Sequence, residues 1–489
     1  MTLHQNGGSS TYVMEAPDVE LNDLSHYISK PADAKVATAQ PTFIDTDKTR
    51  ESDDPVERLP SPTTQADEPL ERWNAPRLNF YKTSAAFWSF IVMGANDAAY
   101  GALIPYLQEY YNLTFVIISL VFLSPLVGYT ASALLNNAIH LKFGQRGVAF
   151  LSPGCHIIAY VVIAVHPPYP VLVVVFMLAG FGNGLADAAW NAWIGNMSNA
   201  NEVLGFLHGF YGLGAVLSPL IATTMITKGQ RLPWYTFYYV MIGLAVIELA
   251  TSIAAFWSAT GAVFREKNER TTDSKDSRMK EALIRMPYAR ITWICAIFLL
   301  GYVGVEVALG GWIVKFMLEV RNGGDFASGM VATGYWMGIT VGRVILGFVT
   351  PRIGEKLAII VRVIYVPSLY ALTWPQIYLA LTMALELIFW LVPQFYVSAV
   401  AVAFQGFLMG PLFPAAIVVA TKLLPKHLHV SAIGFAAAFG GSGAAIFPFA
   451  VGAIAQAKGV KVLQPIVLAL LAAILALWMC LPRIRSKTE

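Results

Sequence analysis

The chain begins with a polar stretch and continues as a series of long apolar segments separated by short polar loops. From about Arg77 onward, each apolar segment is close to the length of about 20 residues that a helix needs to span a bilayer. Six segments precede a charged stretch between Arg265 and Arg290, and six follow it. Their centres fall near Gly94, Phe122, Ile157, Gly180, Gly214, Leu244, Gly304, Gly338, Leu385, Gly406, Gly440 and Leu471. The pattern predicts an all-α membrane protein with twelve transmembrane helices in two six-helix halves.

The same pattern predicts five regions along the chain. Residues 1–80 are rich in Pro, Ser, Thr and acidic residues, too polar to bury a core, and are expected to form a disordered cytoplasmic tail. This tail is either a solvated spacer or a regulatory arm. The two helical halves are expected at 81–260 and 288–482, with a cytoplasmic central loop at 261–287 and a short cytoplasmic tail at 483–489. Without a signal-peptide pattern at the start, the first helix is expected to direct the chain to the membrane.

Composition supports a membrane protein and excludes several other classes. Of 489 residues, 56% are hydrophobic and 13% are charged, whereas soluble domains carry roughly 25% charged residues. A disordered protein, a nucleic-acid-binding protein and an ordinary cytosolic enzyme all fit poorly. The three Cys lie in apolar runs, the eight His are scattered, and no phosphate-binding loop motif occurs, so we expect no cofactor. The expected partners are the lipid bilayer and a small-molecule solute, and the chain is expected to be a monomer.

Orientation follows from Lys and Arg in the short loops, which concentrate on the cytoplasmic side of multi-pass proteins. Placing both termini in the cytoplasm puts Lys142, Arg146, Arg352 and Lys356 inside, together with the charged central loop. We therefore expect a multi-pass protein with both termini cytoplasmic. The plasma membrane is the first expectation, and the vacuolar membrane or another endomembrane is the alternative.

Asp97 lies in the middle of the first apolar segment, where an ionisable residue is costly and marks a functional site by default. At 100° per residue, Gly94, Asp97, Gly101 and Gln108 share one helical face. Asn96 and Tyr100 stand beside the acid and are candidates for contact with the solute.

Asp187 repeats this arrangement in the fourth segment, where Gly180, Gly184, Asp187 and Asn191 share one face. Burial disfavours the charged form of a carboxyl group, and this is the property that a proton carrier needs. Asp97 and Asp187 are therefore the candidate proton-coupling residues, with Asn191 as a candidate solute ligand. The alternative is that each acid is satisfied by a neighbouring polar group and never titrates.

Further candidates for solute binding lie in the fifth and seventh segments. Glu306 is an acid in an apolar run with Trp312 nearby, a combination that suits a hydroxylated or ring-containing solute. His208 and Tyr211 could hydrogen-bond the same solute, although a packed and satisfied His is the competing interpretation. Two other acids, Glu248 and Glu386, also occur in apolar runs but lack the glycine-rich setting, and we expect structural roles for them.

Three motifs together resemble the major facilitator superfamily, close to its fucose/proton symporter branch and to fungal bypass-of-stop-codon-like transporters. They cover residues 94–105, 187–191 and 207–219, with Asp187 where the branch has Glu. The resemblance implies a transporter for sugar-type solutes, with proton coupling through the acids of the first and fourth helices. Those acids are Asp97 and Asp187 here.

Gly342 and Arg343 resemble the loop motif that the superfamily carries after the second helix of each half. The resemblance implies a gating role, in which Arg343 caps carbonyl groups at a helix end or pairs across the halves. An anchor on the cytoplasmic side is the alternative. The segment 361–376, with Arg362 and two Pro, is longer than relatives require, and is either a natural insert or a retained intron.

The leading function is a secondary active transporter for a sugar-like solute or a fungal metabolite, working by alternating access around a site at the bilayer midplane. A receptor of the same fold that binds without transport is one alternative, favoured by the long acidic tail. A membrane-embedded enzyme is a weaker one, because no cluster of metal ligands or nucleophiles is apparent. The sequence leaves open whether the solute enters or leaves the cell.

Overall fold

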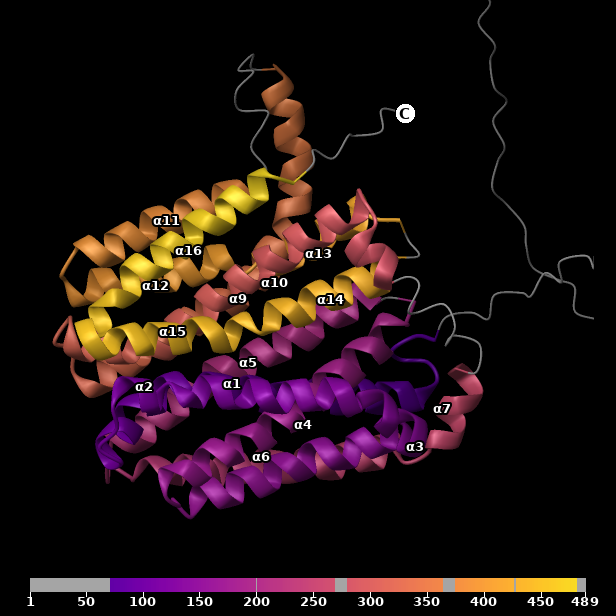
Figure 1. The fold of residues 1–489 in the computed structure, drawn as a ribbon, viewed down its shortest axis with the longest axis horizontal. Coiled ribbons are helices and arrows are strands. Elements are labelled where there is room, and N and C mark those ends of the chain that lie inside the picture. The colour runs from indigo at the N-terminus through magenta and orange to yellow at the C-terminus, as the bar shows by residue number, and fades with distance from the viewer. Residues whose placement is uncertain (1–70, 199, 269–278, 364–373, 426–427, 482–489) are drawn as a thin grey trace, which may run out of the picture. The chain divides into compact units, whose positions relative to one another are not determined.

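The structure is a computed structural model that describes residues 71–198, 200–268, 279–363, 374–425 and 428–481. In these residues the regular elements are α-helices with short 3-10 turns (Figure 1). The N-terminal set comprises α1 (Arg77–Tyr110), α2 (Phe115–Ile118), α3 (Leu120–Ala164), α4 (Tyr169–Gly195), α5 (Ala200–Thr227), η1 (Trp234–Thr236) and α6 (Phe237–Phe256). The all-helical architecture predicted from the apolar segments is confirmed.

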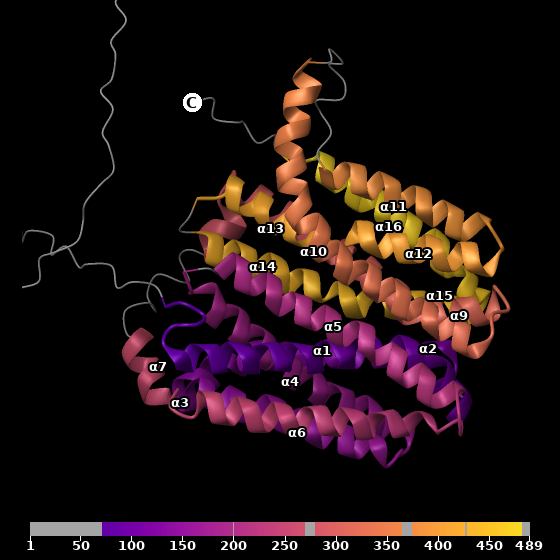
Figure 2. The same ribbon diagram turned by 180° about the vertical axis from the view of Figure 1, so that it is seen from behind.

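The second set of helices follows a short connecting helix, α7 (Gly261–Asn268). It comprises α9 (Tyr288–Glu319), α10 (Asp325–Val363), α11 (Trp374–Leu391), α12 (Phe395–Met409), α13 (Leu412–Leu423), α14 (His429–Gly441), α15 (Gly443–Lys458), η4 (Val460–Val462) and α16 (Leu463–Met479). From both sides, α1 to α6 lie beside one another, and α9 to α16 form a neighbouring group (Figures 1 and 2). Each of the twelve predicted centres lies inside one of these helices.

Nine helical segments of the described residues are long and apolar enough to cross a membrane. One of them, Phe115–Ala164, has 50 residues, which corresponds to about 75 Å of helix at 1.5 Å per residue. Gly144 breaks it with φ 70° and ψ −164°. Two crossings of a core about 30 Å thick therefore fit within this segment. α1 and α10, with 34 and 39 residues, are not among the nine.

The predicted loop between the second and third apolar segments is reduced to the break at Gly144. A Cβ atom there would lie 2.4 Å from the backbone oxygen of Ala259, so only glycine fits the close approach of the two chains. The amide of Arg146 donates to the same oxygen across 3.0 Å. The predicted central loop begins with α7, whose Arg265 donates to the backbone oxygen of Leu141 across 2.6 Å.

Several predicted boundaries need correction or lie outside the described residues. α1 begins at Arg77, four residues before the expected start of the first half. Most of the expected N-terminal tail, the whole of the C-terminal tail 483–489 and residues 364–373 of the expected insert lie outside the described residues. The helical segment around Gly410 and Pro411 is interrupted, since α12 ends at Met409 and α13 begins at Leu412.

Small residues allow the two sets of helices to approach each other closely. A Cβ atom on Gly101 of α1 would lie 2.0 Å from the backbone oxygen of Gly310 on α9. On α5, a Cβ atom on Gly212 would lie 2.5 Å from the hydroxyl oxygen of Thr340 on α10. Close contacts of this kind drive helix association in a bilayer. Lipid chains are as apolar as the helix surfaces, so the hydrophobic effect does not bring the helices together there.

Candidate functional site

Asp97 lies at the centre of a hydrogen-bonded cluster that joins α1, α4 and α5. Its Oδ1 accepts from Asn96 Nδ2 at 3.1 Å and from Asn183 Nδ2 at 3.0 Å. Its Oδ2 accepts from the hydroxyl of Tyr211 at 3.0 Å. The hydroxyl of Tyr100 accepts a further bond from Asn96 Nδ2 at 3.1 Å. Four residues predicted to form one site are thus brought together.

Glycines hold α1 and α5 close enough for this cluster to form. A Cβ atom on Gly94 would lie 1.9 Å from the backbone oxygen of Tyr211, and one on Gly214 would lie 2.0 Å from that of Ile91. Any larger residue at either position would push the helices apart. The sequence therefore places Gly94 one turn before Asp97 for a packing reason, in addition to leaving space for the acid.

Asp187 and Asn191 form the second part of the site, one helical turn apart on α4. Asn191 Nδ2 donates to Asp187 Oδ1 at 2.7 Å and to the backbone oxygen of Asp187 at 3.0 Å. Asp187 is half-buried and lies within electrostatic reach of Asp97. The amide of Asn191 is committed to Asp187, and its carbonyl oxygen is the atom that remains for a solute hydroxyl.

Two residues of this site were missed by the sequence analysis. Asn183 is fully buried and donates to Asp97 from one turn before Asp187. The sequence signal that could have identified it is its position in a glycine-rich run, four residues before Asp187. Tyr129 on α3 lies within electrostatic reach of both acids. Nothing in its apolar surroundings marked it, because its partners are distant in sequence.

Arg343 requires a correction, since it does not lie in a loop or at a helix end. It lies in the interior of α10, within the uninterrupted helix Asp325–Val363. Its Nη2 pairs with Glu306 Oε1 at 2.6 Å and approaches the hydroxyl of Tyr302 at 3.5 Å. The predicted pairing of Arg343 across the halves is therefore wrong for this structure, because α9 and α10 belong to the same set. Gly342, its neighbour, packs against the backbone of Phe407 on α12.

Glu306, Trp312 and His208 take positions that the sequence did not foresee. Glu306 is 5% exposed and is paired with Arg343, so its carboxylate is already neutralised. The indole N–H of Trp312 donates to the backbone oxygen of Pro448 at 2.8 Å, which favours a packing role. His208 lies edge-on to the ring of Phe90, with 5.6 Å between ring centroids.

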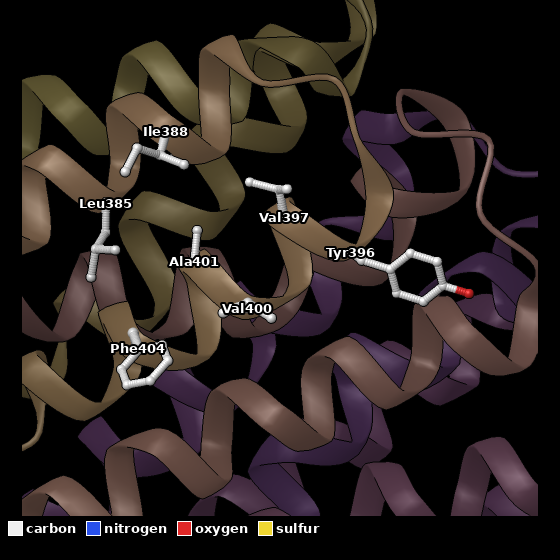
Figure 3. Close-up of a pocket in the computed structure, with 7 residues that line it drawn as sticks. All are labelled: Leu385, Ile388, Tyr396, Val397, Val400, Ala401 and Phe404. Atoms are coloured by element: carbon white, nitrogen blue, oxygen red, sulfur yellow. The ribbon is translucent and has the colours of Figure 1, made fainter.

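A separate apolar hollow of about 390 Å³ lies between α11 and α12 (Figure 3). It is lined by Leu385, Ile388, Tyr396, Val397, Val400, Ala401 and Phe404. Tyr396, Val400 and Phe404 are exposed, at 81%, 56% and 58%. An exposed apolar hollow suits contact with lipid chains, and it offers few hydrogen-bonding groups to a polar solute.

Comparison with known proteins decides the family. The family model of the Major Facilitator Superfamily matches residues 86–384. The chain belongs to the major facilitator superfamily. It is therefore a membrane transporter rather than an enzyme, as the motifs predicted. It is 31% identical over 395 residues to Bypass of stop codon protein 6 of Saccharomyces cerevisiae, an alignment that covers 76% of each chain.

Solved structures of the superfamily agree with the fold. A D-xylose-proton symporter superposes with a TM-score of 0.65 and 14% identity, covering 84% of this chain and 99% of the symporter. The fucose:proton symporter of E. coli superposes with a TM-score of 0.53 and 14% identity, covering 82% of this chain and 98% of the symporter. At such identities the likeness establishes the shared fold and leaves the solute open.

Proposed function

We propose that this transporter moves a small organic solute by alternating access and couples the movement to protons through Asp97 and Asp187. A sugar-like solute is the first class to consider, because the relatives of similar fold are described as xylose and fucose symporters with protons. A fungal metabolite is the second class, since the yeast relative carries no solute in its name.

One observation carries the proton-coupling part of the proposal. The hydrogen-bond donors that the structure gives Asp97 are Asn96, Asn183 and Tyr211, and all three are neutral. Such donors give Asp97 hydrogen bonds but no counter-ion, so this carboxyl group can bind and release a proton without breaking an ion pair. Glu306 differs, because it forms an ion pair with Arg343 at 2.6 Å, which a proton on its carboxylate would have to break. Asp97 is thus better suited than Glu306 to carry a proton.

The two acids would serve different steps of one cycle. Asp97, linked to α4 and α5, takes up a proton when the site opens to the side with more protons. Asp187 and Asn191 stand one turn further along α4 and offer a carboxyl group and an amide carbonyl to solute hydroxyl groups. Solute and proton would then be released together when the two sets of helices rock to the opposite side.

The membrane arrangement belongs to the same proposal. Splitting the segment Phe115–Ala164 at Gly144, and adding α1 and α10 to the other spans, yields twelve crossings. Both termini would then lie on the same side, which the distribution of Lys and Arg favours as the cytoplasm. We propose a monomer in the plasma membrane, with an endomembrane as the alternative.

Counterflow in proteoliposomes tests transport and identifies the solute class. Purified protein is loaded with unlabelled xylose, fucose, glucose or a hydrophobic metabolite, and uptake of the labelled compound is followed with and without an imposed pH gradient. We expect counterflow for at least one sugar and accumulation only with the gradient. A non-transporting receptor of the same fold would bind a sugar without any counterflow, and that result would overturn the proposal.

A further inference from the structure

His156 on α3 and Glu248 on α6 form a buried pair that lies outside the Asp97 cluster. The imidazole Nδ1 and the carboxylate Oε2 are 2.8 Å apart, and both side chains are 0% exposed. Ser89 on α1 donates to the other carboxylate oxygen at 2.6 Å. Both oxygens of Glu248 therefore have a partner, and three helices meet at the pair.

The second imidazole nitrogen of His156 has no partner among the residues that the structure describes. It lies against Gly182 of α4, where a Cβ atom would be 2.8 Å from Nε2. Asn183, the next residue, donates to Asp97, and its own carbonyl oxygen is buried with no partner in the described part of the chain. Buried polar atoms are normally satisfied by protein or by ordered water. Two such atoms lie on neighbouring helices here, Nε2 of His156 on α3 and the carbonyl oxygen of Asn183 on α4.

A stripe of polar groups extends along α3. Ser152, His156 and Tyr160 are spaced four residues apart and are almost fully buried. The ring of Tyr160 stacks on that of His156, with 5.8 Å between centroids. In the described residues, the hydroxyl groups of Ser152 and Tyr160 also lack a hydrogen-bond partner. Apolar packing alone gives no reason for such a stripe inside a membrane protein.

We propose that His156 is a second proton-binding residue, held in position by Glu248, and that it exchanges a proton with Asp97. This proposal rests on the proton coupling proposed above. Glu248 accepts from Nδ1–H and thereby leaves Nε2, the atom facing α4, as the site of proton exchange. Nε2 lies against Gly182, and the next residue, Asn183, donates to Asp97, so α4 lies between the two proton-binding groups.

The proton balance of this step is simple. The imidazolium of His156 loses the proton on Nε2, and the electrons of that N–H bond remain on nitrogen as a lone pair. A water molecule passes a proton on to a carboxylate oxygen of Asp97, which becomes neutral. His156 keeps Nδ1–H toward Glu248, and the total charge of the three groups is unchanged. A proton from the solution then restores the imidazolium.

Other titratable groups also lie around the pair. Tyr160 is itself within electrostatic reach of Glu248, Asp97, Tyr100 and Tyr238. The part of α4 that touches His156 contributes Gly182 and Asn183, which do not titrate. Asp97 and Glu248 are thus the acids that act on His156, and His156→Gln separates its contribution from theirs.

Proton counting on purified protein tests the proposal without any solute. The protein is titrated in detergent between about pH 5 and about pH 8, the range in which His changes charge. We expect His156→Gln to bind about one proton less per molecule than the wild type across this range. Glu248→Gln is expected to show the same loss, because the imidazolium loses its counter-ion. Ser84→Ala on α1 removes an exposed hydrogen bond to the backbone oxygen of Phe80 but no titratable group and no contact with the pair. It is the control and should titrate as the wild type does.

Transport measurements distinguish two outcomes: that His156 takes no part in proton transfer, and that the transporter is not coupled to protons at all. With a sugar that the wild type accumulates, His156→Gln should accumulate less under a pH gradient and retain counterflow. Wild-type titration and wild-type accumulation in both His156→Gln and Glu248→Gln would make the pair structural and leave coupling through Asp97 intact. If the wild type itself ignores the pH gradient, proton coupling fails, while the proton count still decides whether His156 titrates.

Discussion

The amide of Asn183 on α4 donates to Oδ1 of Asp97 on α1 across 3.0 Å, although the two residues are 86 positions apart in the chain. Asn183 is fully buried, and the next turn of α4 carries Asp187. The two acids of the site are therefore joined through one asparagine and one turn of helix. Under the proposed coupling, a change in protonation at Asp97 would be transmitted to the helix that carries Asp187 and Asn191.

Asp187 and Asn191 should behave as one unit in solute binding. Asp187→Asn should flatten the pH dependence of affinity, and Asn191→Ala should weaken affinity at every pH by about 1–3 kcal/mol, the cost of a lost buried partner. The double variant should be little worse than the worse single variant, because contacting groups are not additive. Calorimetry on all four proteins between about pH 5 and about pH 8 provides the measurement. Strictly additive losses would show that the two residues act independently.

Arg343 and Glu306 should depend on each other for stability. Arg343→Met leaves the Glu306 carboxylate buried without its cation and should destabilise the protein by about 3–5 kcal/mol. Arg343→Met combined with Glu306→Leu should recover most of that loss, since an apolar pair of similar volume needs no desolvation. Thermal unfolding in detergent compares the variants. Equal destabilisation of the single and double variants would contradict the pairing seen at 2.6 Å.

Gly94 should not tolerate a side chain, whereas Gly209 on the neighbouring helix α5 should accept one. A Cβ atom on Gly94 would lie 1.9 Å from the backbone of Tyr211, so Gly94→Ala must displace α5 and with it the hydroxyl bonded to Asp97. Overpacking of this kind costs about 1–3 kcal/mol. Gly209→Ala is the matched control on α5, because nothing lies within 4 Å of its added Cβ atom. Equal unfolding temperatures for the two variants would refute the close helix contact.

The fold was largely predictable because apolar runs long enough to cross a bilayer directly predict membrane-spanning helices. All twelve predicted centres lie in helices, and the break at Gly144 falls between Lys142 and Arg146, which the charge pattern placed in a loop. Asp97, Tyr211 and Asn96 were also found, since an acid in a glycine-rich apolar run is costly and therefore conspicuous. Periodicity on a single helix was enough to place Asp97 on one face with Gly94 and Gly101.

Pairings between helices were beyond what the sequence could show. Arg343 was expected at a helix end, because its motif marks one in relatives, yet α10 continues past it and Arg343 pairs with Glu306. Glu248 was expected to be structural, because it lacks a glycine-rich setting. Its partner His156 is 92 residues away in an equally apolar run, so the sequence could not show the pair. Periodicity describes one helix at a time, and only the packing of several helices reveals which charged groups meet.

Asp97→Asn is the most direct test of proton coupling, the central claim for this transporter. Proteoliposomes with the wild type or the variant are supplied with a transported sugar, first under an imposed pH gradient and then in counterflow without one. Asn keeps the shape of the side chain and removes the proton site, so accumulation should be lost while counterflow persists. Full gradient-driven accumulation by Asp97→Asn would contradict the account and remove Asp97 from the coupling step.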